Sequence, residues 1–136
     1  MSPLTAGQAG TSFTIDYEQS GSGQLRARVT GRRGGLETLL EYWYAIADEA
    51  RRIGADMLLV VDELAGDPLP PEQLQGWVGA MAGQGFEKFR IAYVEADGSR
   101  IALLEMAEIH AREHGYNARV FGNESDAAMW LRHGER

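Results

Sequence analysis

Three acidic residues, Asp62, Glu63 and Asp67, follow an apolar stretch and form the densest group of chemically active side chains in this sequence. Their carboxylates could hold a magnesium ion together with water and a substrate phosphate. Ligands of open α/β sheets bind at the carboxyl ends of the strands, which is where these acids fall. The alternative is a plain acidic loop. We take the loop as the prediction, and expect neither a bound metal nor a cofactor.

Nucleophiles are missing from the same region. No Ser, Thr, Cys or His directly follows the apolar stretch, and the chain contains no cysteine, which excludes disulfides and thiolate chemistry. No serine has Gly-x-Ser-x-Gly surroundings, and no glycine pattern completes a dinucleotide or P-loop fingerprint. Because no complementary acid, base and nucleophile can be placed together, we predict that the protein is not an enzyme.

His110 and His114 lie four residues apart, so on a helix they share one face, as two metal ligands would. The first histidine is not followed by the glutamate found in zinc peptidases. The alternative is an exposed pair near a helix end, where His114 would gain from the helix dipole. We predict the exposed pair.

Tyr42, Trp43 and Tyr44 are consecutive in a segment of helical periodicity, where neighbours point about 100° apart. At least one of the two tyrosines should therefore look outward or sideways. Together with Trp77 and Met81 on the next predicted helix, Tyr42 and Trp43 could line a pocket or a dimer interface. The alternative places both tryptophans in the core, with the tyrosine hydroxyls reaching water.

The 136 residues suit a single domain, which we expect to span residues 11–136 behind a loose tail at residues 1–10. A net charge of -7 disfavours nucleic acid, and the only basic concentration, within residues 26–33, is expected to be solvated. No apolar run approaches the roughly 20 residues of a membrane span, and the start lacks a signal peptide. We expect a cytoplasmic protein.

Hydrophobic periodicity predicts nine elements. Residues 13–17 and 25–29 alternate as half-buried strands, and residues 57–61 form a continuous apolar strand suited to the middle of a sheet. The other elements, in chain order, are a helix over 36–53 ended by Gly54, a helix from Pro71 to Gly83 or Gly85, a strand over 90–94, a helix after Ser99, a strand over 117–121 and a helix capped by Asn123 or Ser125.

The resulting order, ββαβαβαβα, predicts an α/β domain with a mixed, mostly parallel five-stranded sheet and four helices. Strands joined by single helices pair in parallel through right-handed crossovers. The first two strands are instead joined by the short Ser-Gly-Ser-Gly segment at residues 20–23, which suits an antiparallel hairpin. The first strand should therefore run antiparallel and lie near an edge.

Four segments carry a resemblance to a known family: Leu25–Gly31, Met57–Asp62, Phe86–Val94 and Ala118–Leu131. Their order and apolar pattern resemble the STAS domain of the anti-sigma factor antagonist SpoIIAA, and most closely the small bacterial SpoIIAA-like proteins. In the phosphorylatable antagonists the central strand leads to a serine that accepts phosphate. Here the corresponding stretch, residues 62–66, carries no hydroxyl, so a phosphoserine switch at that place is chemically impossible.

The resemblance implies a regulatory or protein-interaction module without catalysis, whose partner is another protein or a second copy of the chain. We expect the interaction loop to consist of Asp62, Glu63, Leu64, Ala65, Gly66 and Asp67. The related fold also serves lipid-carrying domains of the Sec14 type. The alternative function is therefore a carrier or sensor of a small hydrophobic molecule, bound between helices and sheet near Trp43, Trp77 and Met81.

Overall fold

The computed structural model describes residues 13–21, 23–67 and 69–133. Its elements are β1 (Phe13–Ser20), β2 (Gln24–Arg32), α1 (Leu36–Ile53), β3 (Met57–Ala65), α2 (Pro71–Ala80), η2 (Phe86–Lys88), β4 (Arg90–Glu95), η3 (Gly98–Arg100), α3 (Ile101–Glu113), β5 (Asn117–Phe121) and α4 (Glu124–His133). The predicted tail at residues 1–10 lies outside the described residues.

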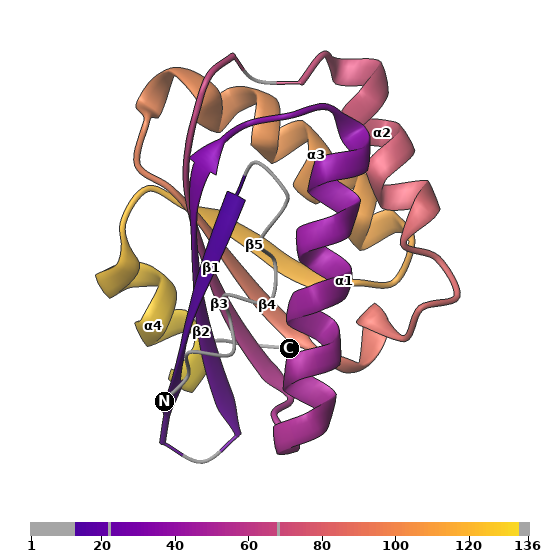
Figure 1. Cartoon of the computed structure of the whole chain (residues 1–136). Coiled ribbons are helices and arrows are strands. Elements are labelled where there is room, and N and C mark those ends of the chain that lie inside the picture. The colour runs from indigo at the N-terminus through magenta and orange to yellow at the C-terminus, as the bar shows by residue number, and fades with distance from the viewer. Residues whose placement is uncertain (1–12, 22, 68, 134–136) are drawn as a thin grey trace.

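The five strands form one sheet in the order β1-β2-β3-β4-β5 (Figure 1). β1 pairs antiparallel with β2, and every other neighbouring pair is parallel. The predicted α/β class, the antiparallel edge strand and the central position of Met57–Val61 are therefore confirmed. β3 lies in the middle because its side chains are buried on both faces of the sheet, with Leu58 and Val60 on one face and Leu59 and Val61 on the other.

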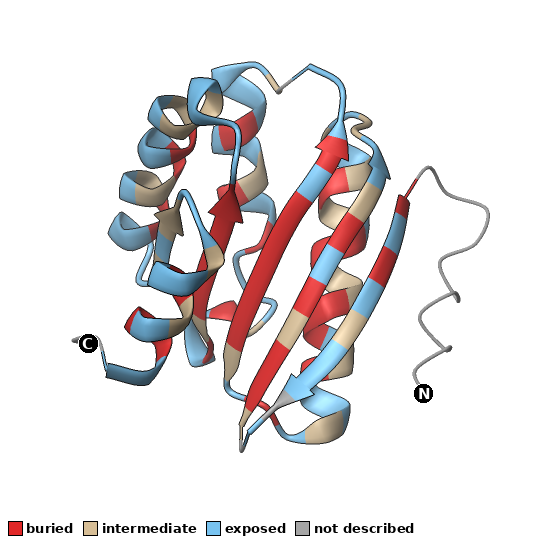
Figure 2. Ribbon diagram, turned by 90° about the vertical axis from the view of Figure 1, so that its left-hand side faces the viewer, coloured by how far each residue is buried: buried red, intermediate tan, exposed pale blue. Residues whose placement is uncertain are grey.

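Helices cover the two faces of the sheet unequally. α1, α2 and α3 pack on one face and bury the larger core, whereas α4 alone packs on the other face, over β3, β4 and β5. On the outer face of β1, Thr14 and Asp16 are exposed and alternate with the buried Phe13 and Ile15, and Figure 2 shows this alternation of exposed and buried positions along the strand.

Element boundaries follow local chemistry. α1 ends at Gly54, whose left-handed φ of 77° strains any residue with a β-carbon, and α2 begins at Pro71, where a missing N–H costs nothing. The Asn123 side chain accepts a hydrogen bond from the Asp126 amide at 2.8 Å, so Asn123 caps α4 and Ser125 does not.

Two predicted boundaries are corrected. β3 continues to Ala65, so Asp62 and Glu63 lie within the strand and not in a loop after it. α2 ends at Ala80, before Gly83 and Gly85. Within the described part of the chain, no helix combines the length and the apolar character that crossing a membrane requires.

Candidate functional site

Asp62 is the centre of a buried hydrogen-bond network at the carboxyl end of the sheet. The Asp62 side chain is fully buried, and the Arg33 side chain is 10% exposed. The two terminal nitrogens of the Arg33 guanidinium donate bidentate hydrogen bonds of 3.0 and 3.2 Å to the two oxygens of the Asp62 carboxylate. The Leu64 amide donates to the same carboxylate at 2.9 Å, and so does the Tyr93 hydroxyl. With four hydrogen bonds accepted, this carboxylate is fully satisfied.

The predicted interaction loop is therefore divided by the pleat of β3. Asp62 and Leu64 point into the core beneath the helices, so the expectation that Asp62 presents its charge to a partner is wrong. Glu63 points to the opposite face, where its carboxylate accepts a hydrogen bond from Arg28 at 2.8 Å in an exposed ion pair. Ala65, Gly66 and Asp67 are exposed.

The predicted solvated basic segment is also corrected. Arg33 lies directly after β2 and is buried against Asp62, and Arg26 makes a two-pronged pair with Glu124 of α4 at 2.8 and 2.9 Å. The signal for the first pair was present in the sequence: Arg33 follows one strand and Asp62 ends the apolar run of the next, and carboxyl ends of parallel strands share one edge.

Glu95 forms a second buried acid that the sequence analysis missed, although it ends β4 at the same edge. One of its oxygens, Oε2, accepts a hydrogen bond from the Asp97 amide at 3.1 Å. The other, Oε1, lies 3.7 Å from Arg33 and 3.8 Å from Arg100, beyond hydrogen-bond distance. Burial raises the pKa of Glu95, and the nearby Asp62 raises it further, whereas the Asp97 amide and both arginines act in the opposite direction.

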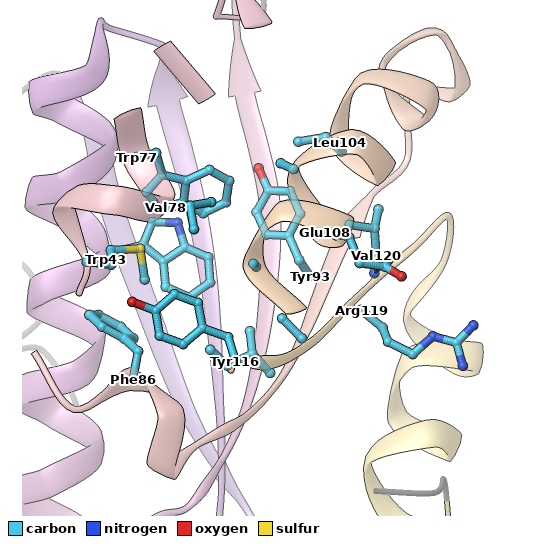
Figure 3. A pocket seen from close by; sticks show the side chains of 15 residues that line it. Trp43, Trp77, Val78, Phe86, Tyr93, Leu104, Glu108, Tyr116, Arg119 and Val120 are labelled. Carbon is cyan, nitrogen blue, oxygen red and sulfur yellow. Dashed lines mark hydrogen bonds between the residues drawn. The ribbon is translucent and has the colours of Figure 1, made fainter. Parts of the chain in front are cut away.

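An apolar cavity lies between the three helices and the sheet (Figure 3). Trp43 of α1 and Trp77 of α2 stand on one side, Leu104 and Val120 on the other, with Tyr93 between them. The unfilled space totals about 520 Å³ including its open mouth, of which about 50 Å³ admits the centre of a water-sized sphere. Its remaining lining residues are Val78, Met81, Phe86, Ile91, Ala107, Glu108, Ala111, Tyr116, Ala118 and Arg119.

The structure thus places three of the four predicted pocket residues, Trp43, Trp77 and Met81, around this cavity. Tyr42 does not line it and is fully buried behind Trp43, where the two rings stack with centroids 6.0 Å apart. Tyr44 is the tyrosine that turns sideways, and its hydroxyl donates to the Ala80 carbonyl at 3.2 Å.

A smaller cavity adjoins the first at the carboxyl edge of the sheet. It admits the centre of a water-sized sphere over about 20 Å³, and its polar walls come from Arg33, Glu95 and Arg100. Trp77, Tyr93 and Leu104 line both cavities and separate them. We call the first the aromatic cavity and the second the polar cavity.

Neither His110 nor His114 lines the aromatic cavity or the polar cavity. The His110 and His114 rings have centroids 4.7 Å apart, and His114 Nδ1 lies 3.0 Å from the His110 carbonyl oxygen. Among the residues that the structure describes, no group of three or more His, Cys, Asp or Glu side chains is arranged to hold a metal ion.

Comparison with known proteins adds no relative. No family model matches the chain, and no curated protein matches it. Function is therefore inferred from the geometry of the two cavities and of the buried network beside them.

Replacing Asp62 by Asn should strongly destabilise the protein, because Arg33 would lose its hydrogen-bonded counter-charge and keep only the Glu95 carboxylate at 3.7 Å. We expect a loss of roughly 3 kcal/mol in the free energy of unfolding, measured by urea denaturation. Glu63→Gln, the same charge change one residue along, should cost less than about 1 kcal/mol because its pair is exposed. Equal losses in the two variants would contradict a structural role for the buried pair.

Glu95→Gln should change how stability depends on pH. A carboxyl whose pKa is raised by folding holds its proton more tightly in the folded state than in the unfolded state. Its contribution to stability therefore falls as the pH rises above the ordinary pKa of a glutamate. The free energy of unfolding of Glu95→Gln, relative to the parent protein, should therefore increase as the pH rises above the ordinary glutamate pKa of about 4.3. Urea denaturation at several pH values measures it, and a constant difference would contradict the expectation.

Proposed function

We propose that this protein binds a small hydrophobic molecule in the aromatic cavity, as a carrier or sensor, without catalysing a reaction. The observation that carries the proposal is an unfilled apolar space beside Trp43 and Trp77, enclosed by three helices and the sheet. About 50 Å³ of this space admits the centre of a water-sized sphere, which is room for a few non-hydrogen atoms, so a larger molecule would also occupy the open mouth of the cavity.

The energetics of packing support this proposal. Protein interiors are normally close-packed, and a void deprives its lining side chains of dispersion contacts, which lowers stability. Here the void lies among large aromatic side chains that could have packed more tightly. A bound apolar molecule would restore those contacts.

The hydrogen bonds of Asp62 favour a binding function over a catalytic one. The Asp62 carboxylate accepts hydrogen bonds from Arg33, from the Tyr93 hydroxyl and from the Leu64 amide. These bonds occupy both of its oxygens. A general acid or base must instead reach a substrate. We also propose, on the resemblance of the four sequence segments and on the mixed sheet with its antiparallel edge strand, that the chain is a SpoIIAA-like, STAS-type protein of the bacterial cytoplasm.

Ala111→Leu should block binding, because Ala111 on α3 lines the aromatic cavity and the larger side chain would fill it. The probe is N-phenyl-1-naphthylamine, a neutral apolar dye whose fluorescence rises on leaving water. We expect the parent protein to bind it and the variant to bind at least about tenfold more weakly, a difference of roughly 1.4 kcal/mol.

Ala102→Leu is the matched control for this experiment. Ala102 lies on the same helix, is exposed and lines none of the cavities described above, so the dye affinity should not change. Equal effects of the two substitutions, or no dye binding to the parent protein, would contradict the proposal. Native mass spectrometry of freshly purified protein provides a second readout through the mass of any co-purified hydrophobic molecule.

A second candidate function is protein interaction, and a separate surface favours it. Met106 and Ile109 on α3 are 58% and 59% exposed, beside a groove of about 140 Å³ between α2 and α3. Exposed large apolar side chains next to one another are typical of interaction sites. The interaction would use this surface, to which the exposed acids Glu63 and Asp67 of the predicted loop do not belong.

If the interaction partner is a second copy of the chain, Ile109→Glu should abolish self-association, because a charge would be buried in an apolar interface. Sedimentation velocity over increasing protein concentration measures the effect. Met129→Glu is the control, since Met129 is 54% exposed on α4, on the opposite face of the sheet. Purely monomeric parent protein, or equal effects of both substitutions, would rule out this mode of assembly.

A further inference from the structure

Three buried polar atoms around the polar cavity have no hydrogen-bond partner among the described residues. They are Arg33 Nε, Trp77 Nε1 and Glu95 Oε1, and all three side chains line this cavity. Buried polar groups are nearly always hydrogen-bonded in native proteins, because leaving one unpaired costs free energy. A water molecule or a ligand group in this cavity, which has room for about one water, would satisfy them.

The chemistry of these atoms defines what would satisfy them. Arg33 Nε and Trp77 Nε1 carry hydrogens and can only donate, whereas an ionised Glu95 Oε1 can only accept. A single group that both accepts and donates, such as a hydroxyl, matches this set. An ether oxygen can accept a hydrogen bond but cannot donate one, and a hydrocarbon can do neither.

The charges around the polar cavity favour a neutral group. Arg33 is paired with Asp62, and Glu95 faces both Arg33 and Arg100, so the two buried carboxylates are matched by two guanidinium groups; the half-exposed Asp97, 3.7 Å from Arg100, is a further acid on the solvent side. A charged head group would leave one buried charge unmatched, at a high cost in free energy. A neutral head group preserves the balance.

We propose that the molecule bound by this protein is amphipathic, with an apolar body in the aromatic cavity and a neutral, hydroxyl-type head group in the polar cavity. This inference rests on the proposed function and assigns the chemical class of its ligand. Arg33, Trp77 and Glu95 form the head-group site, and the aromatic cavity selects the apolar body.

The proposal requires the wall between the two cavities to open, and its three side chains are held to different degrees. Of its three side chains, Tyr93 is held by the hydrogen bond from its hydroxyl to Asp62. The Trp77 indole nitrogen has no such anchor within the described chain, and the residue is only half-buried on α2. A molecule that spans both cavities would therefore require rotation of the Trp77 ring together with a change of the Leu104 rotamer.

The test compares 1-octanol, 1-methoxyheptane and nonane, which have equal numbers of non-hydrogen atoms, as competitors of N-phenyl-1-naphthylamine on the full chain. A purely apolar site would follow hydrophobicity and bind nonane best. The proposed site reverses this order: 1-octanol should bind about tenfold more tightly than nonane, with the ether between them. Equal or tighter binding of nonane would overturn the head-group proposal and leave the proposed function standing, whereas absence of binding by the dye and all three competitors overturns both.

Trp77→Phe removes the indole donor and keeps an aromatic ring. The variant should lose most of the preference for 1-octanol while still binding nonane, which also shows that its cavity is intact. An unchanged preference would overturn the assignment of Trp77 to the head-group site. Octanoate and octylammonium complete the comparison, and tighter binding of either than of 1-octanol would contradict a neutral head group.

Discussion

The buried pair between Arg33 and Asp62 is the interaction on which the carboxyl edge of the sheet depends. It connects the residue that follows β2 to the centre of β3, and the Tyr93 hydroxyl extends the connection to β4. A buried charge is tolerated when it is paired and hydrogen-bonded, so arrangements of these elements that break the pair carry a high cost in free energy. The chain after Arg33 is equally restricted: a β-carbon on Gly34 would lie 2.2 Å from the Thr38 hydroxyl oxygen, so only glycine fits there.

This network determines the shape of the space above the sheet. Because Asp62 holds Tyr93, the tyrosine ring stands at a fixed place between the helices, 6.0 Å from Trp43 and 6.2 Å from Trp77 between ring centroids. Large planar rings that meet at tilted angles leave unfilled space around their edges. The same buried network thus stabilises the sheet edge and builds the wall that divides the aromatic cavity from the polar cavity.

The sequence was a reliable guide where neighbouring residues decide the outcome. The continuous apolar run at Met57–Val61 predicts a central strand, and Gly54 and Pro71 predict helix boundaries, because these preferences arise from local backbone and burial requirements. The prediction from the sequence is wrong where a charged residue is buried. Asp62 was expected at the surface because charges are rarely buried without a partner, and the partner, Arg33, lies 29 residues earlier in the chain.

By itself, the sequence determined the α/β class, the order of the elements, the antiparallel first strand and the absence of a hydroxyl side chain within residues 62–66. It also named Trp43, Trp77 and Met81 as residues that could share a pocket. Only the tertiary structure decided that Asp62 is buried against Arg33 and Tyr93, that one oxygen of Glu95 has no hydrogen bond from the described residues, and that the two cavities meet at Trp77. These features depend on side chains brought together from separate strands and helices, and periodicity along one segment carries no information about such distances.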